Sequence, residues 1–136
     1  MKTADPADDR GQVTPFVVVM ALSFITCLGL VYEGGELLRA RSQTSTLAQE
    51  AARVGAQQLD WDAYREGADE VPLDASAAAA AAQAFLGSAG AAGTVTVSGD
   101  TVTVTCTLAY SFTLLPAGST TVETTASARP HTQSTS

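Results

Sequence analysis

The chain has little of the side-chain chemistry from which catalytic and metal sites are built. Its 136 residues include one histidine and two cysteines, and the histidine, His131, stands in the polar C-terminal tail. The sequence contains no Cys/His cluster with metal-ligand spacing, no nucleophile elbow and no phosphate-binding loop. Paired acids such as Asp60 and Asp62 lack the other ligands of a calcium loop. We therefore expect a protein that is not an enzyme and that binds no cofactor or metal ion.

Basic residues are also scarce. Seven Lys and Arg residues stand against fourteen Asp and Glu, which gives a formal net charge of −7. Between residues 60 and 128, Arg65 is the one base among eight acids. An acidic surface repels phosphate backbones, so we expect no nucleic acid as a partner and take the acidity to favour solubility.

The two cysteines stand in segments of different character. Cys27 lies inside a long apolar run, and Cys106 lies in a strand-like segment far downstream. If the first is in lipid and the second outside it, their Cα atoms cannot reach the distance of about 4.4–6.8 Å that a disulfide needs. We expect both to be free and to act as small hydrophobes.

The strongest positive feature is an uncharged run at residues 13–32, VTPFVVVMALSFITCLGLVY. A helix of this length rises about 30 Å, the thickness of the hydrocarbon core of a bilayer. A cleaved signal peptide has a shorter apolar core of roughly 7–15 residues. The run therefore predicts a retained, single-pass anchor, which we call the apolar span; a buried core helix is the alternative.

Past the apolar span the helical pattern continues. Small or apolar residues follow one another at alternating steps of three and four, which places them on one side of a helix close to a heptad seam. This small-residue face suits close approach by a partner helix or by the chain's own strands. We expect residues 13–59 to form one long helix and the face to be an assembly interface. The members of the small-residue face are Leu37, Ala40, Thr44, Leu47, Ala51 and Val54.

The remainder of the chain predicts a small α+β domain. Residues 60–73 are an acidic connector with one short turn, and Asp74 or Ser76 can cap a helix that runs through six alanines to Leu86. From Thr94 the apolar period changes to two, which predicts a hairpin with one apolar and one threonine face, then a third strand at residues 122–128. Both helices are available to cover the apolar face. We divide the chain into a flexible leader (1–12), the span (13–32), its helical continuation (33–59), the connector (60–73), an α+β ectodomain (74–128) and a disordered tail (129–136).

Glu33 stands where the apolar span ends. It marks the membrane surface, or it needs a partner because an unpaired charge at the lipid boundary is costly. Arg39 is six residues on, too far round the helix for a standard pair, so a basic group on another subunit would make Glu33 an assembly residue. The flanking charges, Lys2 and Arg10 before the span and Arg39 and Arg41 after it, do not set an orientation. The greater length after the span favours an exported C-terminal domain.

Several short motifs resemble the TadE/TadG-like proteins of Tad (tight-adherence, Flp-type) pilus assembly. They are Asp9-Arg10-Gly11 before the span, Glu33-Gly34 after it, Leu37-Leu38-Arg39-Ala40-Arg41, and the alanine-rich residues 48–56. The resemblance implies a pilin-like fold and a minor pilin or pseudopilin-like component. Such a protein would be anchored in the cytoplasmic membrane with its C-terminal domain outside, and would pack against other pilus subunits.

The resemblance also raises the question of processing. Prepilins of this superfamily are cut by a prepilin peptidase after a glycine that a glutamate follows about five residues later. Gly11 is the candidate glycine, but Phe16 stands where that glutamate would be, so the chain is closer to the TadG-like, unprocessed pattern. Two other functions remain open: a signal-anchored extracellular binding or adhesive β-module, and a membrane-bound accessory or sensor that binds a ligand through its acidic ectodomain.

Overall fold

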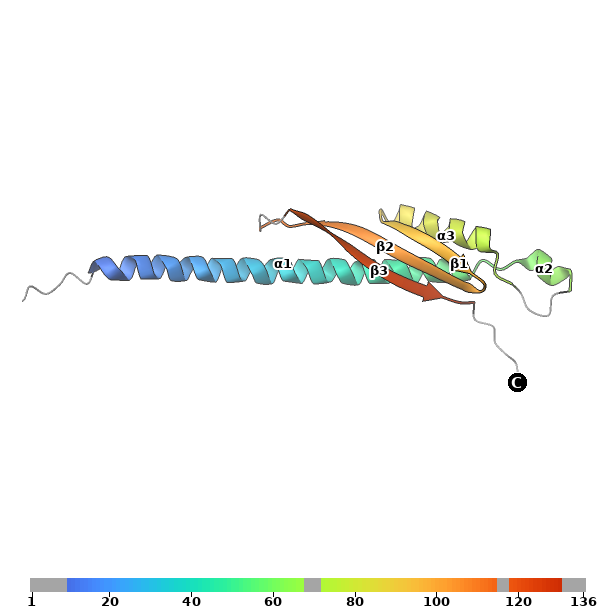
Figure 1. The fold of residues 1–136 in the computed structure, drawn as a ribbon, viewed down its shortest axis with the longest axis horizontal. Coiled ribbons are helices and arrows are strands. Elements are labelled where there is room, and N and C mark those ends of the chain that lie inside the picture. Colours follow the sequence, from blue (N-terminus) through green and yellow to red (C-terminus); the bar gives the residue numbers. More distant parts are fainter. Residues whose placement is uncertain (1–9, 68–71, 115–117, 131–136) are drawn as a thin grey trace, which may run out of the picture.

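A computed structural model describes residues 10–67, 72–114 and 118–130. The described residues form one long helix, two shorter helices and a three-stranded sheet laid along the second half of the long helix (Figure 1). The fold is therefore α+β, as predicted. In chain order the elements are α1 (Arg10–Ala56), α2 (Trp61–Arg65), α3 (Ala75–Ser88), β1 (Ala92–Ser98), β2 (Thr101–Ser111) and β3 (Ser119–Ala128).

Helix α1 has 47 residues, which corresponds to about 70 Å at 1.5 Å per residue. It begins at Arg10, so Pro15 lies in its second turn. It ends at Ala56, three residues before the predicted end, and the chain then leaves the helix to form a short backbone pairing. Leu59 pairs with Leu73 in an isolated antiparallel bridge, and the Asp60 N–H donates to the Pro72 carbonyl at 2.8 Å.

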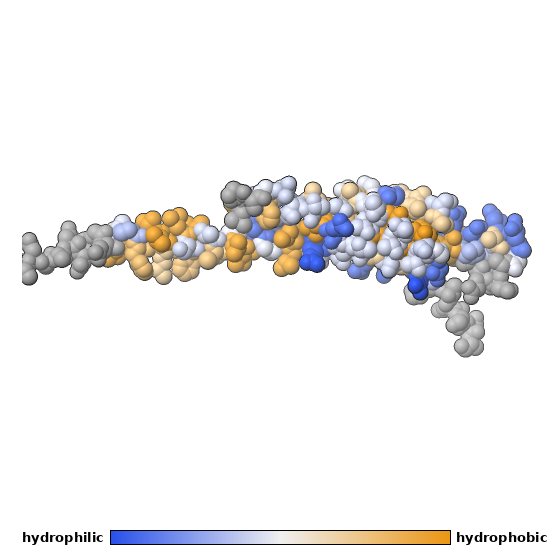
Figure 2. Space-filling view, viewed as in Figure 1, coloured by the Kyte–Doolittle hydropathy of each residue, from blue (hydrophilic) through white to orange (hydrophobic). Residues whose placement is uncertain are grey.

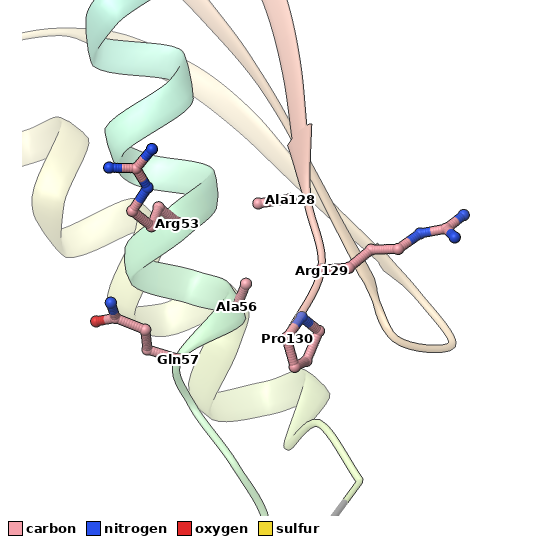
Figure 3. A pocket seen from close by; sticks show the side chains of 6 residues that line it. All are labelled: Arg53, Ala56, Gln57, Ala128, Arg129 and Pro130. Atoms are coloured by element: carbon pink, nitrogen blue, oxygen red, sulfur yellow. The ribbon is translucent and has the colours of Figure 1, made fainter. Parts of the chain in front are cut away.

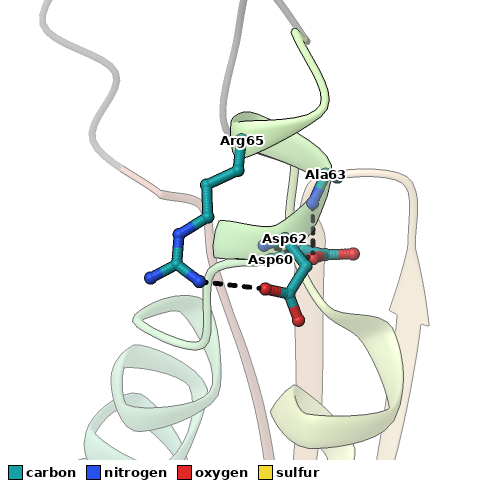
Figure 4. Close-up of polar contacts among 4 residues, drawn as sticks. All are labelled: Asp60, Asp62, Ala63 and Arg65. Atoms are coloured by element: carbon teal, nitrogen blue, oxygen red, sulfur yellow. Dashed lines mark hydrogen bonds and ion pairs between the residues drawn. The ribbon is translucent and has the colours of Figure 1, made fainter.

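The connector is closed by that bridge and contains the single turn of α2. Figure 4 shows the polar contacts of two of its acids, Asp60 and Asp62. The Asp60 carboxylate caps α2 by accepting from the N–H groups of Asp62 and Ala63, at 3.1 and 3.0 Å. The Asp62 carboxylate lies 3.4 Å from the Arg65 guanidinium. These two acids therefore have structural partners, and the described residues hold no group of three potential metal ligands.

The sheet is antiparallel with β2 in the centre, in the order β1-β2-β3. The first hairpin turns at Gly99 and Asp100, as the sequence predicts, and Gly99 has φ +60°, a left-handed conformation that glycine adopts without steric cost. The apolar side chains of β2 alternate with threonines and are buried, Val102, Val104 and Cys106 in turn. On the other face of the sheet, β1 and β3 present threonines to solvent.

Helices α1 and α3 cover the apolar face of the sheet together. They pack through small side chains, which let the three elements approach closely: a Cβ built on Gly55 would lie 3.0 Å from both the Ala78 carbonyl oxygen and a methyl carbon of Val102. Asp74 is the residue that caps α3, and its carboxylate accepts from the N–H groups of Ser76 and Ala77. The core consists of Ala48, Ala51, Ala52, Ala56, Ala78, Ala82, Leu86, Val102, Val104 and Cys106.

The two cysteines are free, as predicted. Cys106 is fully buried in the core, and this burial raises the pKa of its thiol, while the Thr107 N–H lowers it in part. The thiol therefore stays protonated and serves as a small apolar group. Cys27 lies on the exposed surface of α1 within the apolar span.

Candidate assembly site

The apolar span forms a bare rod that projects from the domain. Figure 2 shows it as an almost continuous hydrophobic surface, in contrast to the mostly hydrophilic surface over the rest of the chain. Its large side chains are more than half exposed along its length; Phe24, for example, is 64% exposed. The helix is long and apolar enough to cross a membrane.

Two hydroxyl groups within the span are already satisfied by the helix itself. Ser23 Oγ donates to the Val19 carbonyl and Thr26 Oγ1 to the Leu22 carbonyl, each at 2.8 Å. Unpaired polar groups are costly in hydrocarbon, so these bonds make both residues compatible with lipid.

The small-residue face of α1 is turned toward the chain's own domain. Ala51 is fully buried and Ala40 nearly so, and both lie on the side that the sheet covers. Leu47 packs against the core and Val54 is half-buried, while Leu37 lines a shallow groove between α1 and β3. In the structure this half of α1 is covered within the chain itself, by strands β2 and β3 and by helix α3.

Glu33 is the most unusual residue of the site. Its side chain is only 2% exposed, although it stands at the end of the apolar span. The carboxylate accepts hydrogen bonds from the Tyr110 hydroxyl at 2.9 Å and from the Thr113 N–H at 2.8 Å. The Leu114 N–H donates to the same oxygen as Thr113. We call these four residues the Glu33 cluster.

The Glu33 cluster joins α1 to the end of β2, although the residues it connects lie far apart in the sequence. Sequence reasoning predicted that Glu33 needs a partner and looked for a base on another subunit; within the described residues the carboxylate accepts from a phenol and two backbone N–H groups. Every residue except proline has a backbone N–H group, so nothing in the sequence indicated that Thr113 and Leu114 would be the donors to Glu33. Tyr110 did carry a signal: it is the last of the alternating apolar residues of β2 and carries a polar group at its tip.

Tyr110 is held in the neutral form that donates this hydrogen bond. Its pKa is raised, first by burial and then by the hydrogen bond and the negative charge of Glu33. Its ring makes an edge-to-face contact with Phe112, with the ring centroids 5.3 Å apart. Among the described contacts, Glu33 is thus held by a neutral phenol and by two backbone N–H groups.

A hollow of about 500 Å³ lies where α1 and β3 end, and Figure 3 shows its lining. Two arginines border it, but their side chains point in different directions. Arg53 lies 3.6 Å from Glu50, and Arg129 donates to the Thr101 hydroxyl at 2.9 Å. Because the guanidinium groups do not converge, the hollow is not built to hold an anion.

The described residues thus form a stem helix that is long and apolar enough to span a membrane, with a small α+β domain laid on its second half and hydrogen-bonded to it at the end of the apolar span. Residues 11–58 match the family model described as "Putative Flp pilus-assembly TadE/G-like". The chain is therefore TadE/G-like in this region, as the resemblance predicted; the match begins at Gly11, in the first turn of α1, and ends just past that helix. Searches of the curated proteins and of the solved structures find no match.

Proposed function

We propose that the protein is a minor pilin or pseudopilin-like component of a Tad/Flp-type pilus or secretion apparatus, and that it acts by helix packing rather than by catalysis. The observation that carries this proposal is the division of α1. One half is bare and apolar, and the other half is the spine of a folded domain. The family match covers both halves of the same helix.

In this proposal the apolar span anchors the chain in the cytoplasmic membrane as a single pass, with the domain outside. The bare surface of the span is then the surface available to other subunits. The half-buried ends of the small-residue face, at Leu37 and Val54, extend it beyond the membrane, and Glu33 sets where the domain begins. Prepilin peptidase is a further partner if the chain is cut after Gly11.

Retention of the span is supported by the Glu33 cluster. A cut just after the span, near residue 34, would separate Glu33 from the domain and leave the Thr113 and Leu114 N–H groups without their acceptor. The alternative of a released extracellular β-module is favoured only by the exposed threonine face of the sheet. Mass spectrometry of the mature chain distinguishes an intact N-terminus, a start after Gly11 and a start near residue 34.

The proposal is tested by fractionation together with a pilus assay. We expect the chain to stay in the membrane after alkaline carbonate washing, and the residues after Tyr32 to be cut by protease added to wall-stripped cells. Deleting the gene should reduce surface pili, and restoring it should recover them. A chain released by carbonate, or a deletion strain with normal pili, would contradict the proposal.

A further inference from the structure

The end of β2 lies at the same height along α1 as the end of the apolar span. Glu33 directly follows Tyr32, the last residue of the span, and its carboxylate holds the backbone of Thr113 and Leu114. In Figure 1 this end of β2 reaches back along α1, away from α3 and the hairpin turn. If the span crosses a bilayer, as the proposed function requires, these residues lie at its surface.

Several side chains at this height are apolar or aromatic and at least partly exposed. Leu114 is 59% exposed, Tyr32 is 57% exposed and Phe112 is half-buried against Tyr110. The sequence contains no charged residue from position 108 to position 122. Aromatic side chains gather at membrane–water interfaces because one part of the ring system is apolar and another can hydrogen-bond.

Three of the polar groups at this height have a partner within the protein. The two backbone N–H groups and the Tyr110 hydroxyl all donate to the Glu33 carboxylate. Irregular backbone is costly near hydrocarbon unless its N–H groups have partners within the protein. The Glu33 cluster supplies those partners, so the backbone here is suited to an environment with little water.

We propose that residues 112–114 form a second membrane contact, in which Leu114 enters the interfacial region of the leaflet on the domain side and Glu33 fixes its depth. The partner is the lipid surface itself, because Glu33 ties this segment to the end of the apolar span and the side chains of Tyr32 and Leu114 are both exposed there. The domain would then rest on the bilayer at two points and could not swing freely about α1. This inference rests on the membrane anchoring in the proposed function.

Tryptophan fluorescence of the full chain in liposomes tests the contact. The native Trp61, which lies on the exposed surface of α2, is first replaced (Trp61→Phe). Single tryptophans are then introduced at Leu114, at Phe24 inside the span and at Thr96 on the exposed face of β1. All three positions are exposed, so each variant is expected to fold. The liposomes carry lipids brominated either close to the headgroup or deep in the acyl chain.

We expect Leu114→Trp to show blue-shifted emission and a loss of intensity that is larger with the shallow bromines. Phe24→Trp should be quenched more by the deep bromines, and Thr96→Trp by neither. Solvent-like, unquenched emission from Leu114→Trp, with Phe24→Trp quenched, would overturn this inference and leave the anchor standing. If Phe24→Trp is also unquenched, the anchor in the proposed function fails and the second contact fails with it.

Discussion

The two halves of α1 share one helix geometry but solve opposite packing problems. Residues 13–32 carry large side chains that are exposed, whereas residues 40–56 carry mostly small ones on the side that is buried. Lipid adapts to any side-chain shape, so a span gains from large apolar residues. A sheet and a second helix are rigid and can come close only over alanine and glycine, as the contacts at Gly55 show. Glu33 marks the boundary between the two environments.

The largest effect is expected from a charge placed in the covered half. Ala51 has no exposed surface, so Ala51→Asp would bury a carboxylate in an alanine-lined contact without a partner. We expect it to lower the free energy of unfolding of the domain by about 4 kcal/mol. Thermal unfolding of the full chain in detergent micelles, followed by circular dichroism, measures this loss.

Two matched changes on the same helix complete that test. Gln43→Asp alters an exposed position and should change the unfolding free energy by less than about 0.5 kcal/mol. Ala21→Asp lies in the span and should leave the domain folded while it weakens membrane insertion by about 3 kcal/mol. If Ala51→Asp and Gln43→Asp have equal effects, the covered half is not the spine of the domain.

The second prediction concerns the boundary. Glu33→Ala removes the buried acceptor of three donors, two of them backbone N–H groups, and should cost about 3 kcal/mol of unfolding free energy. Glu33→Gln keeps one carbonyl acceptor and should cost about half as much. Hydrogen exchange at the amides of Thr113 and Leu114 should rise in both variants.

A nearby carboxylate provides the control for Glu33. Glu36 lies 3.0 Å from Arg39, whose side chain is 78% exposed, and Glu36→Gln should cost less than about 0.5 kcal/mol. Unchanged exchange at Thr113 in Glu33→Ala would show that Glu33 does not hold the end of β2.

The same boundary shows what the sequence could predict and what it could not. Periodicity was sufficient for the long helix and the hairpin, because each follows from local patterns of side chains. Residue types left the cap of α3 between Asp74 and Ser76, and the pattern named the two helices as the available covers for the sheet; the structure shows Asp74 as the cap and both helices on the apolar face. The identity of the contact surface was less accessible: a small-residue face suits a foreign helix as well as the chain's own strands, and only the folded structure shows Ala51 buried in a core shared with α3 and β2.

The partner of Glu33 could not be predicted for a related reason. The sequence shows that a charge at the edge of an apolar run needs compensation, but compensation by backbone N–H groups leaves no trace in residue types. The end of α1 was missed for the same cause. The Leu59–Leu73 bridge that ends it is a backbone pairing between two residues that resemble ordinary helix and connector positions.

The third prediction applies one substitution to both halves of α1. Ala52 is fully buried, so Ala52→Leu should overpack the contact and lower the unfolding free energy by about 2 kcal/mol. Ala21→Leu puts the same side chain on the lipid side, where it should leave the domain unaffected. Chemical unfolding of the two variants in the same detergent provides the comparison. Equal costs would mean that the two halves of α1 meet similar surroundings.

The smallest effect is expected from acid. It should act on the folded domain, through the cap of α3, and not on the span. The pKa of Asp74 is lowered, chiefly by the hydrogen bond from the Ala77 N–H and next by the Ser76 side chain. A carboxyl group whose pKa is lower in the folded state adds stability above its unfolded pKa and loses it as the pH falls through the folded value. Protonation of Asp74 should therefore loosen the start of α3 below the usual range for aspartate. The span has no carboxyl group between residues 13 and 32 and should not respond.

Unfolding curves taken from about pH 6 to about pH 3 should show a pH-dependent loss of stability that is smaller in Asp74→Asn, because asparagine caps a helix without titrating. An identical loss in both chains would assign the acid sensitivity to other carboxyl groups and remove α3 from the account.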